Sequence, residues 1–145
     1  MKKLGDKFRI DLGQYVDALK GKGAFLVLQH MGPGWVRKKS MGFSKLQQIE
    51  LTRLVSMRKQ FSRDDFPELY AQDEKGHAAY VTAEHNEAVE AHALSMLAEC
   101  ATGVEVPPDL GLPSSPRELV EYLGIAPYLL GEMLSGQRLE PEQVF

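Results

Sequence analysis

One stretch between residues 82 and 101 carries side chains of the types that bind metals or act as nucleophiles. His85, His92, Met96 and Cys100 recur there at helical spacing. The seven-residue step from His85 to His92 spans about 10.5 Å along a helix, too far to share an ion whose ligand distances are about 2 Å. His92 and Cys100 lie two turns apart, beyond mutual hydrogen-bond reach. We therefore interpret the stripe as a packed helix face. A pH-sensitive interface is the remaining functional interpretation.

No other pattern predicts catalysis. The chain has no HExxH or GxSxG motif and no glycine-rich phosphate loop. Its one cysteine, Cys100, excludes an internal disulfide framework and a zinc site built on paired cysteines. Acidic residues are spread over expected helix faces rather than paired in an apolar setting. We expect neither an enzyme nor a bound cofactor or metal.

Charge divides the chain into two parts. Through Arg63 there are 14 Lys and Arg against 4 Asp and Glu, and from Asp64 onward there are 3 against 16. The basic part should attract nucleic acid or an acidic protein, and the acidic part a basic partner. Alternatively, the two parts attract one another, within a monomer or head-to-tail in a dimer. For 145 residues we expect a basic α+β half, 1–63, and an acidic helical half, 64–145, or one domain made of both.

The sequence also predicts a cytoplasmic protein without a membrane partner. No apolar run reaches the roughly 18 residues that a membrane-spanning helix needs. The N-terminal residues MKKLGDKFRID contain lysines but no apolar stretch after them, so they do not form a signal peptide. A single cysteine is typical of a reducing compartment.

The basic half opens with strand signals. Residues 8–12 alternate apolar and polar side chains, and residues 24–28 (AFLVL) form an apolar run bounded by glycines. The turn signal Gly32-Pro33-Gly34 follows, so residues 35–39 could return as the second arm of a hairpin. There Trp35 stands beside Arg37, Lys38 and Lys39. The four residues could stack on bases and bind phosphate, or Trp35 could anchor the hairpin while the cations face water.

Helical patterns dominate the rest. Ser44 opens a capping box before a helix, 44–61, whose apolar residues surround much of its circumference, so it should form the core of its half and could offer a dimer face. Residues 78–81 could be a brief third strand. Thr82 should cap a helix that runs to about residue 101. Residues 103–113, rich in proline and glycine, are the expected linker.

The segment 115–142 should contain two short amphipathic helices joined by a tight turn. Ser115 can cap the first helix, with Pro116 at its first position and Glu118 completing a capping box. Gly124 should end it, because a positive φ is usually needed there. Pro127 restarts a helix that Gly136 closes. Helices this short cannot bury their apolar stripes alone, so the histidine-bearing helix must pack on them.

This segment resembles the helix-turn-helix of phage-repressor (Xre-like) proteins and related antitoxins. The residues that carry the resemblance, about a fifth of the chain, are Leu119, Leu123, Gly124, Ile125, Leu130, Met133 and the Ser135-Gly136-Gln137-Arg138 tail. It implies a compact DNA-binding module whose second helix enters the major groove. The chain departs from the pattern at Val120, where the family prefers alanine, and at Gly131 inside the reading helix. The residues at the base-reading positions are Ala126, Pro127, Tyr128, Gly131 and Glu132, of which only Tyr128 has a hydroxyl.

Two functions follow. The first is a small DNA-binding transcriptional regulator of repressor or antitoxin type, acting as a homodimer on double-stranded DNA. Its expected nucleic-acid contacts are Arg117, Tyr128, Gln137 and Arg138, together with Trp35, Arg37, Lys38 and Lys39 from the basic half. The second is a protein-binding adaptor or inhibitor that keeps the helix-turn-helix shape without reading DNA and meets a partner of opposite charge. For the fold we expect a mostly helical α+β protein, in which a helix and β-hairpin half packs on a helical half.

Overall fold

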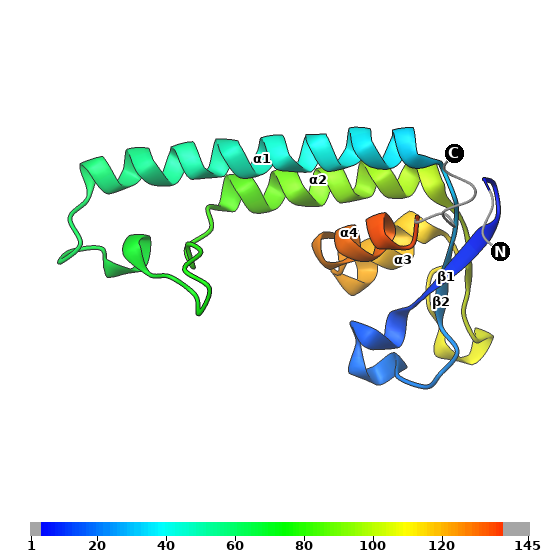
Figure 1. Ribbon diagram of the computed structural model, residues 1–145. Coiled ribbons are helices and arrows are strands. Elements are labelled where there is room, and N and C mark those ends of the chain that lie inside the picture. Colours follow the sequence, from blue (N-terminus) through cyan, green and yellow to red (C-terminus); the bar gives the residue numbers. More distant parts are fainter. Residues whose placement is uncertain (1–3, 138–145) are drawn as a thin grey trace.

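The computed structural model describes residues 4–137, which form four α-helices and a three-stranded sheet (Figure 1). The mostly helical α+β class is therefore confirmed. In chain order the elements are β1 (Lys7–Asp11), β2 (Phe25–Gln29), α1 (Pro33–Gln60), α2 (Ala83–Cys100), β3 (Ala101–Glu105), α3 (Pro116–Leu123) and α4 (Ala126–Ser135). Short 3-10 turns occur at Leu12–Gln14, Asp17–Leu19, Pro67–Tyr70 and Pro108–Leu110.

The sheet is antiparallel throughout, with β2 in the centre. Phe8 pairs with Leu28 and Ile10 with Leu26, so the two strands expected near the N-terminus are confirmed, and they pair with each other. Along β2 the buried and half-buried residues alternate, as the two-residue period of a strand requires. Leu26 and Leu28 point into the core, where helices cover that face of the sheet.

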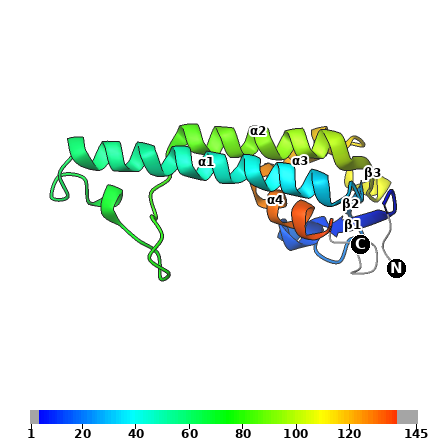
Figure 2. The ribbon, with the colours of Figure 1, turned by 45° about the horizontal axis from the view of Figure 1, so that its top comes forward.

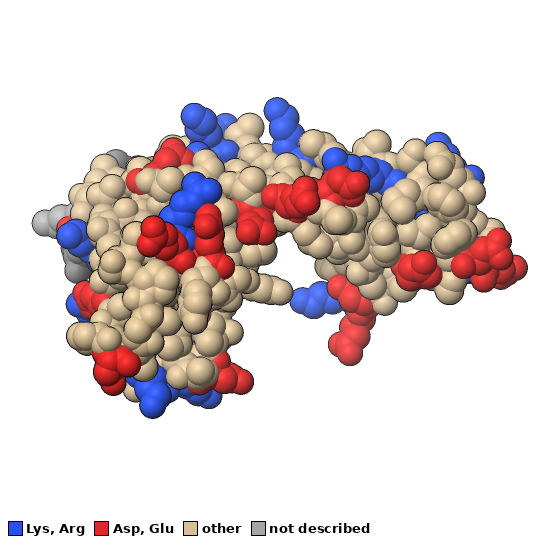
Figure 3. Space-filling model, turned by 180° about the vertical axis from the view of Figure 1, so that it is seen from behind, with Lys and Arg blue, Asp and Glu red and all other residues tan. Residues whose placement is uncertain are grey.

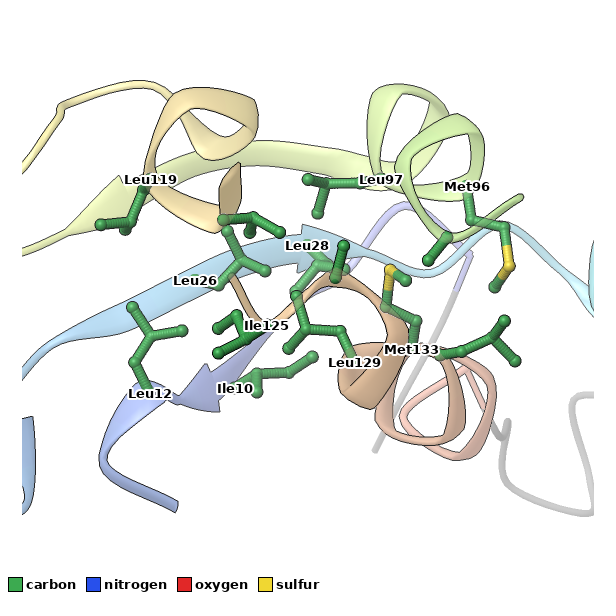
Figure 4. Close-up of a cluster of buried hydrophobic side chains, with 14 of the residues drawn as sticks. Ile10, Leu12, Leu26, Leu28, Met96, Leu97, Leu119, Ile125, Leu129 and Met133 are labelled. Atoms are coloured by element: carbon green, nitrogen blue, oxygen red, sulfur yellow. The ribbon is translucent and has the colours of Figure 1, made fainter. Parts of the chain in front are cut away.

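The core lies between this sheet and the helices α2, α3 and α4 (Figure 4). The members labelled in Figure 4 are Ile10, Leu12, Leu26, Leu28, Met96, Leu97, Leu119, Ile125, Leu129 and Met133. The core therefore draws on both sides of the charge switch at residue 63. The charge of the chain changes at residue 63, but the elements before and after it share one core.

The expected bent pair of helices near the C-terminus is confirmed. The Ser115 hydroxyl accepts a hydrogen bond from the Glu118 N–H at 3.2 Å. Gly124, at φ +67°, ends α3 in the left-handed conformation, and its N–H donates to the Val120 and Glu121 carbonyls. Both helices contact α2, and α4 does so most extensively. The histidine-bearing helix α2 thus packs on α3 and α4, which are too short to bury their apolar stripes alone.

The most conspicuous feature is an arm formed by α1, residues 61–82 and α2, which projects from the core (Figures 1 and 2). Its two helices run antiparallel. They have 28 and 18 residues, which correspond to about 42 and 27 Å. We call residues 61–82, at the far end of the arm, the tip segment. None of the helices within residues 4–137 combines the length and the apolar character needed to cross a membrane.

The start of α1 corrects two expectations. Residues 35–39 are not the second arm of a hairpin, because α1 begins at Pro33, and Ser44 is not a helix start but lies inside α1. Gly32 occupies the position before the helix at φ +99°, and Pro33 takes the first helical position. A glycine followed by proline marks a tight turn, but proline is also preorganised to begin a helix. Here the second property applies.

Two further expectations are wrong. Residues 78–81 do not form a strand. A single bridge joins Gln72 to Ala78 across a turn of the tip segment. The third strand instead lies partly inside the expected linker 103–113, as β3. It follows α2 without a loop, because Ala101 already has extended dihedrals (φ −75°, ψ 135°).

Candidate interaction surfaces

The exposed side of α4 is short of groups that attract DNA. Leu129, Leu130 and Met133 face the core. Ala126 is buried as well, so the base-reading positions that remain exposed are Tyr128, Gly131 and Glu132. Tyr128 is 70% exposed, and α4 contains no lysine or arginine. This surface offers one aromatic hydroxyl and one carboxylate.

The other expected contacts of this segment are engaged elsewhere. Arg117 is exposed but forms an ion pair with Glu121, with its Nε 2.8 Å from a carboxylate oxygen. Gln137 is 1% exposed, and its carbonyl oxygen accepts from the Met31 N–H at 2.6 Å. Its amide nitrogen donates to the Gln29 carbonyl at 2.9 Å. Gln137 therefore fastens the end of α4 to the end of β2 and is not part of an exposed surface. Arg138 lies outside the described residues.

The expected basic cluster is split between two roles. Lys39 forms an ion pair with Glu99 of α2 and lies 5.8 Å from the centre of the Trp35 ring. The Lys39 ammonium, through its hydrogen bond and its charge, holds the pKa of Glu99 below its usual range. Trp35 packs against the core. These contacts favour the interpretation that Trp35 is an anchor. It lies at the start of α1 and fixes that helix to the core. Arg37 and Lys38 remain exposed.

The histidine and cysteine stripe is packed between helices. The His92 ring lies over Gly42, where an added Cβ would come within 2.8 Å of the ring, and its Nε2 is 3.0 Å from the Lys39 carbonyl. His85 and Cys100 are buried. Within residues 4–137, no three His, Cys, Asp or Glu side chains come together as a set that could hold a metal ion.

The Cys100 thiol is expected to be inert in the folded protein. Burial raises its pKa to about 12, so the thiol form is favoured and its thiolate fraction at pH 8 is about a thousandfold lower than that of an ordinary cysteine. A chromogenic disulfide reagent should therefore react within seconds in denaturant and only at the rate of unfolding without it. A native rate within tenfold of the denatured rate would contradict the buried position.

A polar cluster that the sequence reasoning missed joins α1 to the start of α2. Glu50 is only 5% exposed, and its carboxylate accepts from the Thr82 hydroxyl at 2.7 Å and from the Thr82 N–H at 3.4 Å. The Nδ1 atom of His85 lies 3.6 Å from the same carboxylate. Thr82 also caps α2, because its hydroxyl oxygen accepts from the His85 N–H at 3.2 Å. We call Glu50, Thr82 and His85 the arm bracket. Its sequence signal was Glu50, the one acidic residue of α1, together with the correctly predicted cap.

A groove of about 460 Å³ opens beside the arm bracket, and we call it the arm groove. Its lining residues are Gln47, Glu50, Leu51, Leu54, His77, Ala78, Tyr80, Val81 and His85. A second hollow, of about 400 Å³, is also lined by Tyr80, together with Arg53 and Met57. The chain leading into α2 therefore has an accessible hollow on either side of Tyr80.

Exposed apolar side chains gather on the arm. Ten large apolar residues within 4–137 are exposed, and seven of them lie on the arm: Met41, Ile49, Leu51, Val55, Phe61, Phe66 and Val81. The tip segment, which carries Phe61, Phe66 and Val81, is held in place by Tyr70, whose hydroxyl lies 2.7 Å from both the Arg58 and the Phe61 carbonyls and shares its one hydrogen between them. The Phe61 and Phe66 rings meet edge to face, with their centres 4.8 Å apart.

Comparison with protein-family models, with curated protein sequences and with solved structures finds no match to this chain. Three surfaces of the protein can indicate its function: the exposed side of α4, the cations of α1 and the apolar surface of the arm.

Proposed function

We propose that this protein is a protein-binding adaptor and that it binds its partner through the apolar surface around the arm groove. The observation that carries the proposal is the grouping of exposed apolar side chains on an element that projects from the core (Figure 1). Leu51 is 58% exposed, Val55 and Val81 are each 43% exposed, and two of them line the groove. Contiguous apolar patches of this kind usually mark protein interaction sites.

The outer arm does not serve the core, which supports the same proposal. No residue from 47 to 88 belongs to the core cluster or packs against it among the residues described. Leu54 of α1 and Leu69 of the tip segment are buried, but outside the core cluster. A solvated helical arm normally shows polar residues on its outer side. The apolar residues there are explained if a partner covers them.

The exposed side of α4 also supports the adaptor proposal. A helix that enters the major groove needs donors for base edges and cations for phosphate. The described part of the helix pair has one arginine, Arg117, which Glu121 already neutralises. Glu132 on α4 would repel phosphate. The bent helix pair thus supports an adaptor that keeps a helix-turn-helix shape without reading DNA.

DNA binding by a repressor-type regulator remains a second proposal, favoured by one observation. The exposed charges of α1 are all positive, because its one acidic residue, Glu50, is buried in the arm bracket. The exposed cations are Arg37, Lys38, Lys45 and Lys59. They could contact a phosphate backbone without help from α4.

A salt titration of duplex binding separates the two proposals. Fluorescence anisotropy with a labelled random duplex would be measured from low to physiological salt. An adaptor should show no saturable binding even at low salt. A regulator should bind with a log–log slope of several units, which Arg37→Glu combined with Lys38→Glu would reduce. Binding of that kind would overturn the adaptor proposal.

The site of partner binding is tested by matched pairs of substitutions. The arm variant is Leu51→Asp with Val55→Asp, and the control is Tyr122→Asp with Tyr128→Asp, which adds the same charge to residues about 70% exposed on α3 and α4. Partners retained by the tagged wild-type protein would be identified by mass spectrometry and then purified. The arm variant should lose binding to the purified partner by at least about tenfold, and the control should keep it. The reverse pattern would place the binding site on the helix pair instead.

A further inference from the structure

The outer sides of the two arm helices carry opposite charges. On α2 the exposed ionisable residues are glutamates, including Glu84, Glu87 and Glu90, and the helix contains no lysine or arginine. On α1 the exposed ionisable residues are cations. Figure 3 shows the acidic side chains gathered along α2 on the back of the molecule, with lysine and arginine side chains above them at the edge that α1 forms.

One side of the arm presents both sets of charges and faces away from the core. Lys38, Lys45 and Thr52 recur every seven residues on α1 and are all exposed. Glu84 and Ala91 do the same on α2, up to Ala98, which borders the start of α3. The α2 residues that enter the core, such as Ala93, lie about 200° around the helix from Ala91. We call this side the back face. It also includes Ile49, which is 46% exposed, and Glu87.

The charges on the back face are not matched within the chain. Lys45, Glu84 and Glu87 form no ion pair or hydrogen bond through their side chains with any residue from 4 to 137. By contrast, Lys39 and Glu99, which lie nearer the root of the arm, are paired with each other. The unpaired charges of α1 and α2 can therefore attract opposite charges on another molecule, as Lys39 and Glu99 attract each other within the chain.

We propose that a second copy of this chain covers the back face, with α1 of each copy lying on α2 of the other. The two-fold axis runs parallel to the arms, and the four helices form an antiparallel bundle. Charge selects this arrangement. A two-fold axis across the arms would instead stack α1 on α1, with Lys45 against lysine, and α2 on α2, with Glu87 against glutamate.

The positions of Lys45 and Glu87 along the length of the arm fit this arrangement. In the arm, Gly42 faces His92 and Glu50 faces His85, so Lys45 stands level with residues 89–90. A two-fold axis parallel to the arm leaves the position of each residue along that axis unchanged. Lys45 of one copy therefore lies about 4 Å along the axis from Glu87 of the other, within reach of its side chain. Each such contact occurs twice in the dimer.

The size of the contact sets the expected strength. Two helix contacts, each about 27 Å long and about 11 Å wide, cover roughly 600 Å² per copy, slightly below the standard interface. We therefore expect a dimer of micromolar stability that weakens as salt is added. The dimer would carry two arm grooves, and it does not depend on the adaptor proposal, because its test uses only this protein.

The test is charge reversal followed by mixing, read out by sedimentation velocity at low salt. Wild-type protein should sediment as a dimer of the 16.2 kDa chain at about 0.1 mM. Lys45→Glu and Glu87→Lys should each weaken dimerisation at least about tenfold, because each reversal creates two repulsive contacts. An equimolar mixture of the two variants should restore the dimer, since both contacts become attractive again. The controls Lys22→Glu and Asp109→Lys reverse exposed charges at the globular end and should leave dimerisation unchanged.

Three results would overturn the proposal. One is a wild-type protein that stays monomeric at about 0.1 mM in low salt. Another is a wild-type dimer that both reversals leave intact, since a different face would then be in contact. The third is a mixture of the two reversed variants that remains monomeric. Circular dichroism of each variant confirms that the chain is folded before the comparison is made.

Discussion

Leu129→Ala is expected to lower the free energy of unfolding by about 3 kcal/mol, because it opens a cavity where the helix pair meets the sheet. Leu129 is 1% exposed in the middle of α4, and its side chain lies among Leu28, Ile125 and Met133 (Figure 4). Neither helix of the pair is long enough to be stable alone. Loss of this contact should therefore weaken the whole docking of α4. Urea denaturation followed by circular dichroism measures the change.

The neighbouring residue supplies the control. Tyr128→Ala removes a larger side chain one position earlier, but that side chain is 70% exposed, so its effect should stay within about 0.5 kcal/mol. The contrast tests the orientation of α4 directly. If Tyr128→Ala proved the more costly substitution, α4 would be rotated relative to the structure described here. Both proposed functions would then need a different exposed surface.

Glu50→Ala is expected to cost about 2 kcal/mol and to loosen the outer arm more than the core. The substitution removes two hydrogen bonds to Thr82 and leaves a buried hydroxyl and N–H without their acceptor. It also removes a negative charge beside the N-terminus of α2, where the helix dipole favours an anion. Since no described residue from 47 to 88 belongs to the core cluster, the contacts of the core are unchanged.

Hydrogen exchange resolves where the effect falls. Amides of residues 70–86 should exchange at least about tenfold faster in Glu50→Ala, whereas those of β2 should change only as far as global stability changes. Glu50→Gln keeps an acceptor for the Thr82 hydroxyl and should cost roughly half as much. Gln48→Ala, an exposed change two residues away on α1, serves as the control. Equal acceleration in β2 and the tip segment would show that the bracket supports the whole fold rather than the arm.

Local signals in the sequence predicted the elements whose ends are set by a few side chains. The Ser115 and Thr82 caps, the left-handed Gly124 and the buried strand at 24–28 all act through short-range chemistry. Their positions could therefore be predicted from neighbouring residues alone. The bent helix pair and its brace on α2 followed from the same reasoning, because short amphipathic helices must find a third partner.

The errors occur where tertiary contacts override local preference. Gly32, Pro33 and Gly34 favoured a turn and a hairpin, but Pro33 begins α1, and Gly42 further along that helix lets the His92 ring approach. β3 reads as a linker because of Gly103 and the prolines that follow, and only pairing with β2 makes it a strand. Tertiary context decides such short segments more than propensity does.

The candidate surfaces were predicted less well, for a related reason. Residue type suggested that Gln137 and Lys39 would face a ligand, but burial between elements distant in sequence uses both for packing. Glu50 stands out in the sequence as the one acidic residue of α1, but its partner Thr82 lies 32 residues away and is brought to it only by the packing of the two helices. Exposure, rather than chemical type, separates Arg37 and Lys38 from their neighbour Lys39.

Both roots of the arm are attached to adjacent strands of one sheet. β2 leads into α1 through a few residues, and α2 continues into β3 with no residue between them. A force applied at the tip segment would therefore be transmitted as shear between β2 and β3, and the arm has no hinge at α2 about which to swing freely. Lengthening α2 by a single residue would rotate everything beyond it by about 100° and advance it by about 1.5 Å. Such an insertion would misalign β3 with its partner strand β2. The number of residues in α2 therefore sets the register between these two strands.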